Sequence, residues 1–236
     1  MTRFLLTNDD GIDAPGIAAL ARSLKALDDA HELHWVAPNC QYSGCGHPAI
    51  NLDPIQVDAR DKQPATDAYA VHSSPASCTR LGLRNLVTDV DWVISGVNAG
   101  GNLGIDQYFS GTVAGARQAA MDGKPAIALS QYIDSPKPIH WPTVERWTVE
   151  VLRELMDRPL PEKHFWSVNY PHLDPESPLP ELVFCESSQD SMHLEFKPDA
   201  NGHYIAHSVY RDRPVTPDTD VDICFSGKIA VTQLSL

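Results

Sequence analysis

Short apolar runs alternate with amphipathic segments along the first 170 residues of the chain. Residues 4–7 are apolar or β-prone and form an unbroken run, which is typical of a strand in a parallel sheet covered on both faces. After this run, Ile17, Leu20, Leu24 and Leu27 recur at spacings of three, four and three residues. This periodicity predicts a helix with one buried face, so the chain begins as a strand followed by a helix.

The same two patterns predict the remaining elements. Strands are expected at residues 33–37, 92–95, 126–130, 164–169 and 228–234, and helices at residues 75–86, 113–121 and 143–156. Residues 49–57 and 69–72 are expected to be short strands of an edge hairpin around the charged segment 58–67. An Asn-Gly step at residues 201–202 predicts a second hairpin, in a β-rich excursion at about residues 185–210. The alternation of strands and helices predicts an α/β fold with a mainly parallel sheet.

Composition and charge narrow the possible partners. With 236 residues and 42% hydrophobic content, the chain can form a single domain, residues 1–236. The net charge of −13 argues against nucleic-acid polymers and anionic membranes, because these bind basic surfaces. No apolar run approaches the roughly 20 residues of a membrane span, and we expect no leader because no charged-then-apolar segment precedes the first strand. The five cysteines show no CxxC spacing, so we expect a cytoplasmic protein with reduced thiols.

Two adjacent carboxylates, Asp9 and Asp10, directly follow the first predicted strand. In open α/β sheets, ligands bind beyond the carboxyl ends of the strands. Adjacent carboxylates repel each other unless a cation or a proton lies between them, so an oxygen-ligated divalent ion such as Mg²⁺ or Mn²⁺ is the economical explanation. The alternative is that Asn8-Asp9-Asp10-Gly11 is only a turn, since all these residue types favour turns.

Further polar side chains follow other predicted strands. Ser43 lies in the loop after the second strand, and Asn98 and Asn102 follow the strand at residues 92–95. Hydroxyl and amide oxygens are also hard ligands, which suit Mg²⁺ or Mn²⁺. Residues 110–112, Ser-Gly-Thr, lie at the N-terminus of a predicted helix, where outward-facing N–H groups favour an anion. Taken singly, the asparagine-rich loop is more often a turn and Ser-Gly-Thr more often a helix cap.

Together and in this order, these motifs resemble the SurE family. Its members are the survival-protein nucleotidases, which are metal-dependent phosphomonoesterases acting on nucleoside monophosphates. The motifs that carry the resemblance are Thr7-Asn8-Asp9-Asp10-Gly11, Ala14-Pro15-Gly16, Ala37-Pro38, Ser43-Gly44, Ser95-Gly96-Val97-Asn98-Ala99-Gly100, Asn102-Leu103-Gly104 and Ser110-Gly111-Thr112-Val113. The resemblance is dense over residues 1–130 and thinner afterwards. It implies a Rossmann-like, three-layer α/β/α fold with helices on both faces of the sheet, in which residues 1–130 form a metal- and phosphate-binding core.

The resemblance also implies roles for particular residues. One divalent ion per subunit, Mg²⁺ or Mn²⁺, would be held by Asp9, Asp10, Ser43 and Asn98. The phosphate pocket would be lined by Asn102, Ser110, Gly111 and Thr112. Either Asp9 or Asp10 would accept a proton from the attacking water, and the sequence does not choose between them. The substrates would be nucleoside monophosphates or other small phosphate monoesters, and the assembly a homodimer or homotetramer.

Three stretches depart from the pattern of the family. Ser73-Ser74-Pro75 stands where the family usually has Gly-Thr-Pro, Gln118 where it usually has glutamate, and Gly46-His47-Pro48 where it is richer in serine and threonine. These departures leave open a second hypothesis, a nucleotide- or phosphate-binding protein that has lost turnover. His47 also allows two readings: it could protonate the leaving alkoxide, or it could be a solvated loop residue.

Overall fold

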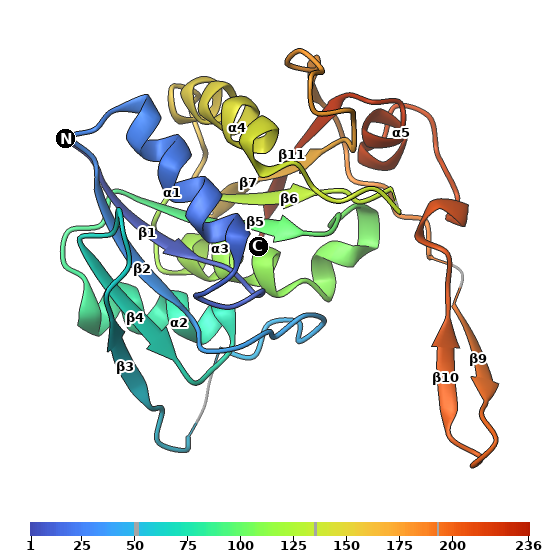
Figure 1. Ribbon diagram of the computed structural model, residues 1–236, viewed down its shortest axis with the longest axis horizontal. Coiled ribbons are helices and arrows are strands. Elements are labelled where there is room, and N and C mark those ends of the chain that lie inside the picture. Colours follow the sequence, from blue (N-terminus) through green and yellow to red (C-terminus); the bar gives the residue numbers. More distant parts are fainter. Residues whose placement is uncertain (50–51, 135, 193) are drawn as a thin grey trace.

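The computed structural model describes residues 1–49, 52–134, 136–192 and 194–236, and these form a nine-stranded sheet with helices on both faces and a separate two-stranded hairpin (Figure 1). The strands are β1 (Arg3–Thr7), β2 (Glu32–Pro38), β3 (Val57–Arg60), β4 (Asp67–Val71), β5 (Trp92–Ala99), β6 (Ala126–Gln131), β7 (His164–Tyr170), β8 (Leu182–Phe184), β9 (Glu195–Pro198), β10 (Tyr204–His207) and β11 (Ile229–Ser235). The large sheet has the order β3-β4-β2-β1-β5-β6-β7-β11-β8.

The six neighbouring strands β4, β2, β1, β5, β6 and β7 are parallel to one another. At the two sides of this group, β3 runs antiparallel to β4 and β11 runs antiparallel to β7. The helices are α1 (Pro15–Leu27), α2 (Pro75–Leu81), α3 (Gly111–Met121), α4 (Trp141–Met156) and α5 (Asp220–Phe225), with shorter turns η1 (Gly82–Leu86), η2 (Gly104–Tyr108) and η3 (Tyr210–Asp212). Helices α1 and α4 cover one face and α2 and α3 the other. The expected three-layer α/β fold with a mainly parallel sheet is confirmed. Among the described residues, no helix is long and apolar enough to cross a membrane.

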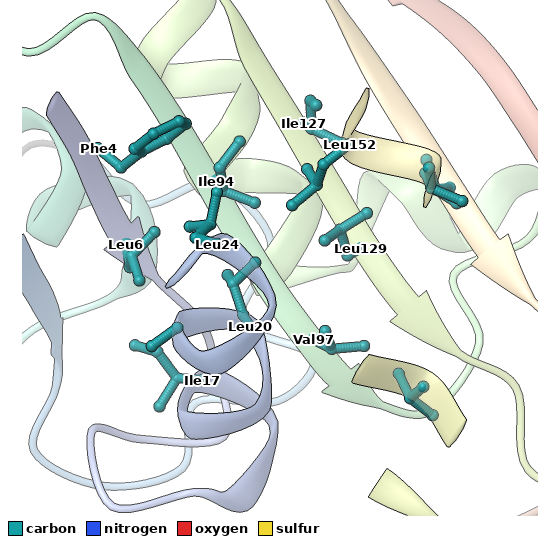
Figure 2. Packing of buried hydrophobic residues seen from close by; sticks show 14 of the residues in the cluster. Phe4, Leu6, Ile17, Leu20, Leu24, Ile94, Val97, Ile127, Leu129 and Leu152 are labelled. Carbon is teal, nitrogen blue, oxygen red and sulfur yellow. The ribbon is translucent and has the colours of Figure 1, made fainter. Parts of the chain in front are cut away.

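The first strand shows why a buried parallel strand is apolar throughout. Phe4 and Leu6 pack into the cluster beneath α1 and α4, whereas Leu5 packs into the cluster beneath α2 and α3 (Figure 2). Successive side chains of a strand point to opposite faces, so a strand covered on both sides is apolar at consecutive positions instead of alternating with polar ones. On α1, the predicted apolar positions Ile17, Leu20 and Leu24 meet this sheet face and are fully buried.

Two glycines allow backbone segments to approach closely at the carboxyl ends of the strands. A Cβ on Gly16, in the first turn of α1, would lie 1.9 Å from Val97 O. Gly96 has a φ of +135°, and a Cβ there would lie 2.3 Å from Leu129 O. The pairing of β5 with β6 shifts register between Ser95 and Asn98. Only glycine fits these positions without displacing backbone, and the bend in β5 sets where Asn98 emerges.

The structure corrects parts of the predicted element map. The edge hairpin exists, but its first strand, β3, lies mostly within the segment 58–67 that was expected to connect the strands. The expected strand at 49–57 is therefore wrong: residues 52–56 carry no strand, and residues 50–51 lie outside the described residues. Strand β5 was expected to end at Ser95, but it continues to Ala99.

The C-terminal third contains the predicted hairpin and two elements that the sequence patterns did not reveal. The antiparallel pair β9–β10 projects from the body of the molecule (Figure 1). The short strand β8 and the six-residue helix α5 were not predicted. Strand β8 has no fully buried residue, and neither element is long enough to show a clear periodicity.

Candidate active site

Asp9 and Asp10 lie in a tight turn where β1 ends. The side chain of Asn8 closes this turn, since its Nδ2 donates to Gly11 O at 2.9 Å and its Oδ1 accepts from Gly11 N at 3.2 Å. Gly11 has a φ of +101°, a conformation that glycine adopts without strain. The stretch is therefore a turn, as the alternative interpretation held, and this turn presents two carboxylates at the carboxyl end of the sheet.

The Asp9 carboxylate is buried against the N-terminus of α3. It is 3% exposed, and its Oδ1 accepts a hydrogen bond from Thr112 Oγ1 at 2.5 Å. Gly111 leaves room beside it, because a Cβ there would lie 2.8 Å from Asp9 Cβ and 3.1 Å from Oδ2. Burial raises the pKa of Asp9 and the charge of Asp10 adds to this, while the hydrogen bond from Thr112 opposes it.

Asp10 faces a different environment. Its Oδ2 accepts a hydrogen bond from Ala99 N at 2.9 Å, which ties it to the end of β5. Asp10 also lines a cavity of about 420 Å³, together with residues of the turn after β2 and Trp141. Burial raises the pKa of Asp10 as well. The turn thus holds two neighbouring carboxylates, of which Asp9 is enclosed and Asp10 borders open space.

These residues fit a hard divalent cation. Burial raises the pKa of both carboxyl groups because it destabilises their ionised forms. A cation between the two carboxylates would stabilise both ionised forms. Among the described residues, no group of three or more His, Cys, Asp or Glu side chains is placed to hold a metal ion. Oxygens from neutral side chains must therefore complete such a site, as the predicted set with Ser43 and Asn98 requires.

Asn98 lies next to the residue that holds Asp10. It is 9% exposed, and its Nδ2 donates to Gly100 O at 2.9 Å. This bond leaves the amide oxygen of Asn98 as the atom that can face a cation. Asp9, Asp10 and Asn98 thus lie at the adjacent carboxyl ends of β1 and β5.

The loop carrying Ser43 is attached to the acidic turn through its backbone. Tyr42 N donates to Asp9 O at 2.7 Å, so the residue before Ser43 is bound to the first carboxylate residue. The Ser43 side chain is exposed, and its hydroxyl accepts from Gln41 Nε2 at 3.0 Å. The structure therefore brings Ser43 to the edge of the site rather than into its buried part.

The predicted phosphate-binding residues have unequal positions. Ser110 is the N-cap of α3, because its Oγ accepts from Val113 N at 3.0 Å. The hydroxyl of Thr112 donates its hydrogen bond to Asp9, so this side chain positions the carboxylate and does not donate that proton to a phosphate. Gly111 begins the helix, where the N–H groups have no partner within the helix. The N-terminus of α3 therefore points its positive end at the acidic turn.

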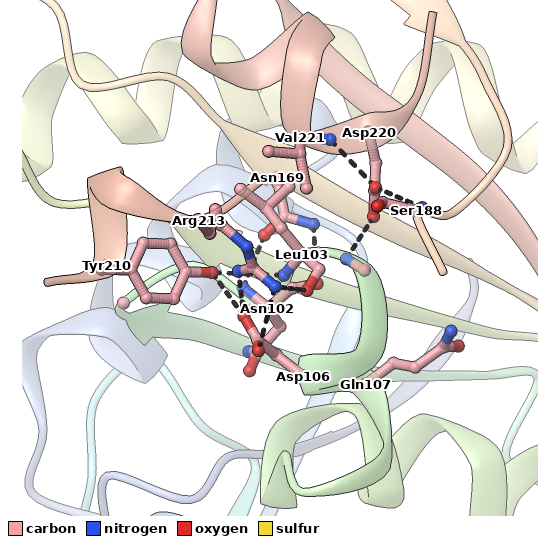
Figure 3. Close-up of polar contacts among 12 residues, drawn as sticks. Asn102, Leu103, Asp106, Gln107, Asn169, Ser188, Tyr210, Arg213, Asp220 and Val221 are labelled. Carbon is pink, nitrogen blue, oxygen red and sulfur yellow. Dashed lines mark hydrogen bonds and ion pairs between the residues drawn. The ribbon is translucent and has the colours of Figure 1, made fainter. Parts of the chain in front are cut away.

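Asn102 is held rigidly by the ends of two neighbouring strands. Its Nδ2 donates to Ser130 Oγ at 2.8 Å, and its backbone N donates to Asn169 Oδ1 at 2.8 Å. Asn169 Nδ2 in turn donates to Asn102 O at 3.1 Å (Figure 3). Asn102 is 8% exposed, so the turn that follows β5 is fixed against β6 and β7.

Sequence reasoning missed the residues that fix the next part of this turn. The side chain of Arg213 is 1% exposed; its Nη1 lies 2.6 Å from Asp106 Oδ2, and its Nη2 donates to Leu103 O at 3.2 Å. Asp220 Oδ2 accepts from Gly104 N at 2.7 Å (Figure 3). Asp106 and Arg213 are 107 positions apart, and no local pattern pairs residues at such a separation.

Comparison with known proteins identifies the family of this chain. A sequence model described as "Survival protein SurE" matches residues 4–193 of the chain. The chain belongs to the SurE family. It is 47% identical over 231 residues to a candidate 5′-nucleotidase of Synechocystis sp., covering 98% of each protein. It is 34% identical over 238 residues to the 5′-nucleotidase SurE of Paramagnetospirillum magneticum, covering 98% of this chain and 89% of that protein.

A solved structure extends the likeness to three dimensions. The crystal structure of the SurE protein from Aquifex aeolicus matches with a TM-score of 0.82 at 29% identity, covering 99% of this chain and 93% of that one. The SurE fold is thus shown over nearly the whole chain.

The three stretches in which this SurE chain departs from the family pattern lie together. His47 Nε2 lies 3.1 Å from Gln118 Oε1. The residue after His47 is bound as well, since the carbonyl of Pro48 accepts hydrogen bonds from Ser74 Oγ and Ser77 Oγ. His47 is half-buried, and this burial lowers the pKa of its imidazole while the contact with Gln118 opposes the shift.

Proposed function

We propose that this chain is a metal-dependent phosphomonoesterase that hydrolyses nucleoside monophosphates to a nucleoside and phosphate. The observation that carries the proposal is the pair of adjacent carboxylates beyond the end of β1, of which Asp9 is buried against the N-terminus of α3 and Asp10 is half-buried at the border of the cavity. The two SurE relatives described above support the substrate class, since the one from Paramagnetospirillum magneticum is a 5′-nucleotidase and the one from Synechocystis a candidate for the same activity.

The residues of the site would divide into metal ligands and a proton acceptor. Asp9, Asp10, Ser43 and Asn98 would hold one Mg²⁺ or Mn²⁺ ion, which when bound supplies positive charge against phosphate oxygens and lowers the pKa of a water molecule. Of the two carboxylates, Asp10 is the better proton acceptor for the attacking water, because it borders the cavity whereas Asp9 is enclosed and bonded to Thr112.

The phosphate group would bind at the N-terminus of α3. Ser110, Gly111 and Thr112 place the first N–H groups of the helix beside the acidic turn, where they can stabilise negative charge on the oxygens of the transferring phosphate. Asn102 would bind the phosphate from the side of β6. Its rigid attachment to Ser130 and Asn169 suits a group that must be in place before the reaction begins.

The test is phosphate release from a panel of nucleoside monophosphates with Mn²⁺, Mg²⁺ or EDTA. We expect release with metal and none with EDTA. A protein that binds nucleotide without turnover would instead show metal-dependent thermal stabilisation by nucleotide and no release. That result would replace the enzyme proposal with the binding-protein hypothesis.

We infer that the chain assembles with copies of itself, as a homodimer or homotetramer, through the hairpin β9–β10. Phe196 is 58% and Tyr204 73% exposed on this hairpin, and isolated two-stranded hairpins are marginally stable in water. A second copy of the chain would cover these aromatic side chains. Sedimentation of the full chain and of a variant lacking residues 194–207 tests this, and equal masses for both would contradict it.

A further inference from the structure

The segment from residue 39 to residue 49, here called the Ser43 loop, has no helix or strand of its own in the structure. Its position depends on hydrogen bonds to neighbouring elements. Tyr42 N is bound to Asp9 O at 2.7 Å, and Gly46 N to Phe109 O at 2.9 Å. Between these attachments, Ser43 is exposed, and a Cβ on Gly44 would have no neighbour within 4 Å. The tip of the loop, Ser43 and Gly44, is thus exposed to solvent. Its position is fixed by the contacts of the residues before and after it.

His47 provides one side-chain attachment of the Ser43 loop, beside the hydrogen bonds that Ser74 and Ser77 donate to the carbonyl of Pro48. Gln118 Nε2 donates to Asp122 Oδ2 at 2.8 Å, and Asp122 is further paired with Arg84. A carboxylate only accepts hydrogen bonds, so the amide oxygen of Gln118 must face His47, and His47 Nε2 must carry the proton that is donated to it. The two hydrogen bonds therefore run in one direction, from His47 to Gln118 and from Gln118 to Asp122.

The other ring nitrogen of His47 is enclosed by the protein. His47 Nδ1 is buried and, within the part of the chain that the structure describes, has no hydrogen-bond partner. One ring nitrogen is thus committed to Gln118 and the other is enclosed. This arrangement suits a residue that holds a loop, and it does not suit one that delivers a proton to a leaving group.

We propose that His47 and Gln118 form a latch that positions Ser43 for the metal site, so that His47 is a positioning residue and not the general acid. The proposal rests on the proposed function, because it assigns the latch to the same site. It assigns a role to Gln118 and His47, neither of which belongs to the predicted metal or phosphate set. Breaking the latch should leave Asp9 and Asp10 in place. Only the contribution of Ser43 to metal binding should be lost.

The experiment is Mn²⁺ titration calorimetry on the full chain, prepared free of metal, with His47→Ala, Gln118→Leu and the double variant. Loss of one hydrogen bond predicts a three- to tenfold weaker affinity for Mn²⁺, on the order expected for a single bond. Because both residues act through one contact, the double variant should be no weaker than the single ones. His47→Gln keeps a donor and should restore most of the affinity.

A second readout does not depend on metal. Hydrogen exchange of the backbone amides of Tyr42 and Gly46 reports whether the Ser43 loop is attached, and both should exchange faster in the latch variants. His72→Ala is the matched control, because His72 Nε2 is also hydrogen-bonded, at 2.9 Å to Asp58 Oδ2, but lies outside the loop. Thermal unfolding of each variant establishes that it is folded under the conditions of the titration.

The possible results distinguish a failure of the latch proposal from a failure of the proposed function. If the parent binds Mn²⁺ but the latch variants bind it equally well, or if the control variant weakens binding as much, the latch is overturned and the proposed function stands. Additive losses in the double variant would also overturn it. If the parent binds no Mn²⁺ and releases no phosphate, the proposed function fails and the latch falls with it.

Discussion

Replacing Gly111 with alanine tests whether the space beside Asp9 matters for metal binding. The new Cβ would lie 2.8 Å from Asp9 Cβ, whereas unstrained carbon atoms stay about 3.5–4.0 Å apart. Asp9 or α3 must therefore shift by at least about 0.7 Å. Overpacking of this kind costs about 1–3 kcal/mol in the free energy of unfolding. A carboxylate misplaced by nearly 1 Å should lower kcat/KM by about tenfold to hundredfold.

The matched control is Gly115→Ala, one turn further along the same helix. A Cβ there would lie 2.9 Å from Ser95 Oγ and 2.9 Å from Thr7 Cγ2, so it overpacks the helix against the sheet without touching Asp9. Urea unfolding should show comparable destabilisation of the two variants. Mn²⁺ titration and phosphate release should fall sharply in Gly111→Ala and much less in Gly115→Ala. Equal Mn²⁺ affinity in both variants would refute the assignment of Asp9.

Three further predictions concern buried polar groups. Thr112→Val leaves the Asp9 carboxylate without its hydroxyl donor and should lower the free energy of unfolding by about 1–3 kcal/mol in urea titrations. Arg213→Ala leaves the Asp106 carboxylate without its cation, with the Tyr210 hydroxyl still donating to it, and should cost about 3–5 kcal/mol in the same assay. Burial lowers the pKa of His31, so the unfolded chain takes up this proton first as the pH falls below about 6.5. The parent should therefore lose stability relative to His31→Leu between pH 7.5 and 5.5, by at most about 1.4 kcal/mol per pH unit, and parallel curves would contradict this.

The elements that sequence patterns predicted are those in which burial is regular. Helix α1 buries one face and β1 both faces, so each leaves a periodic signal in the sequence. Strand β3 lies at the edge of the sheet and has no fully buried residue, so its boundaries could not be read from hydrophobicity. Helix α5 has only six residues, and its first residue, Asp220, is bonded to Gly104 in a distant part of the chain.

In the candidate site too, local motifs could be predicted from the sequence, whereas contacts between distant residues could not. The acidic turn and the Ser-Gly-Thr step are local motifs, so the sequence could place each of them at the end of an element. That Thr112 binds Asp9 could not be predicted, because the two residues are 103 positions apart and only the packing of α3 beside β1 brings them together. The same holds for the contact between His47 and Gln118, which joins a loop to the middle of a helix 71 positions away.

The most direct test of the central claim compares phosphate release by the parent, Asp9→Asn and Asp13→Asn, each with Mn²⁺ and with EDTA. Asp13 is the matched control, since it lies in the same segment but its side chain is 74% exposed and paired with Lys62. We expect metal-dependent release by the parent and Asp13→Asn, and loss of release in Asp9→Asn. Activity that survives EDTA or Asp9→Asn would show that the acidic turn is not the catalytic centre.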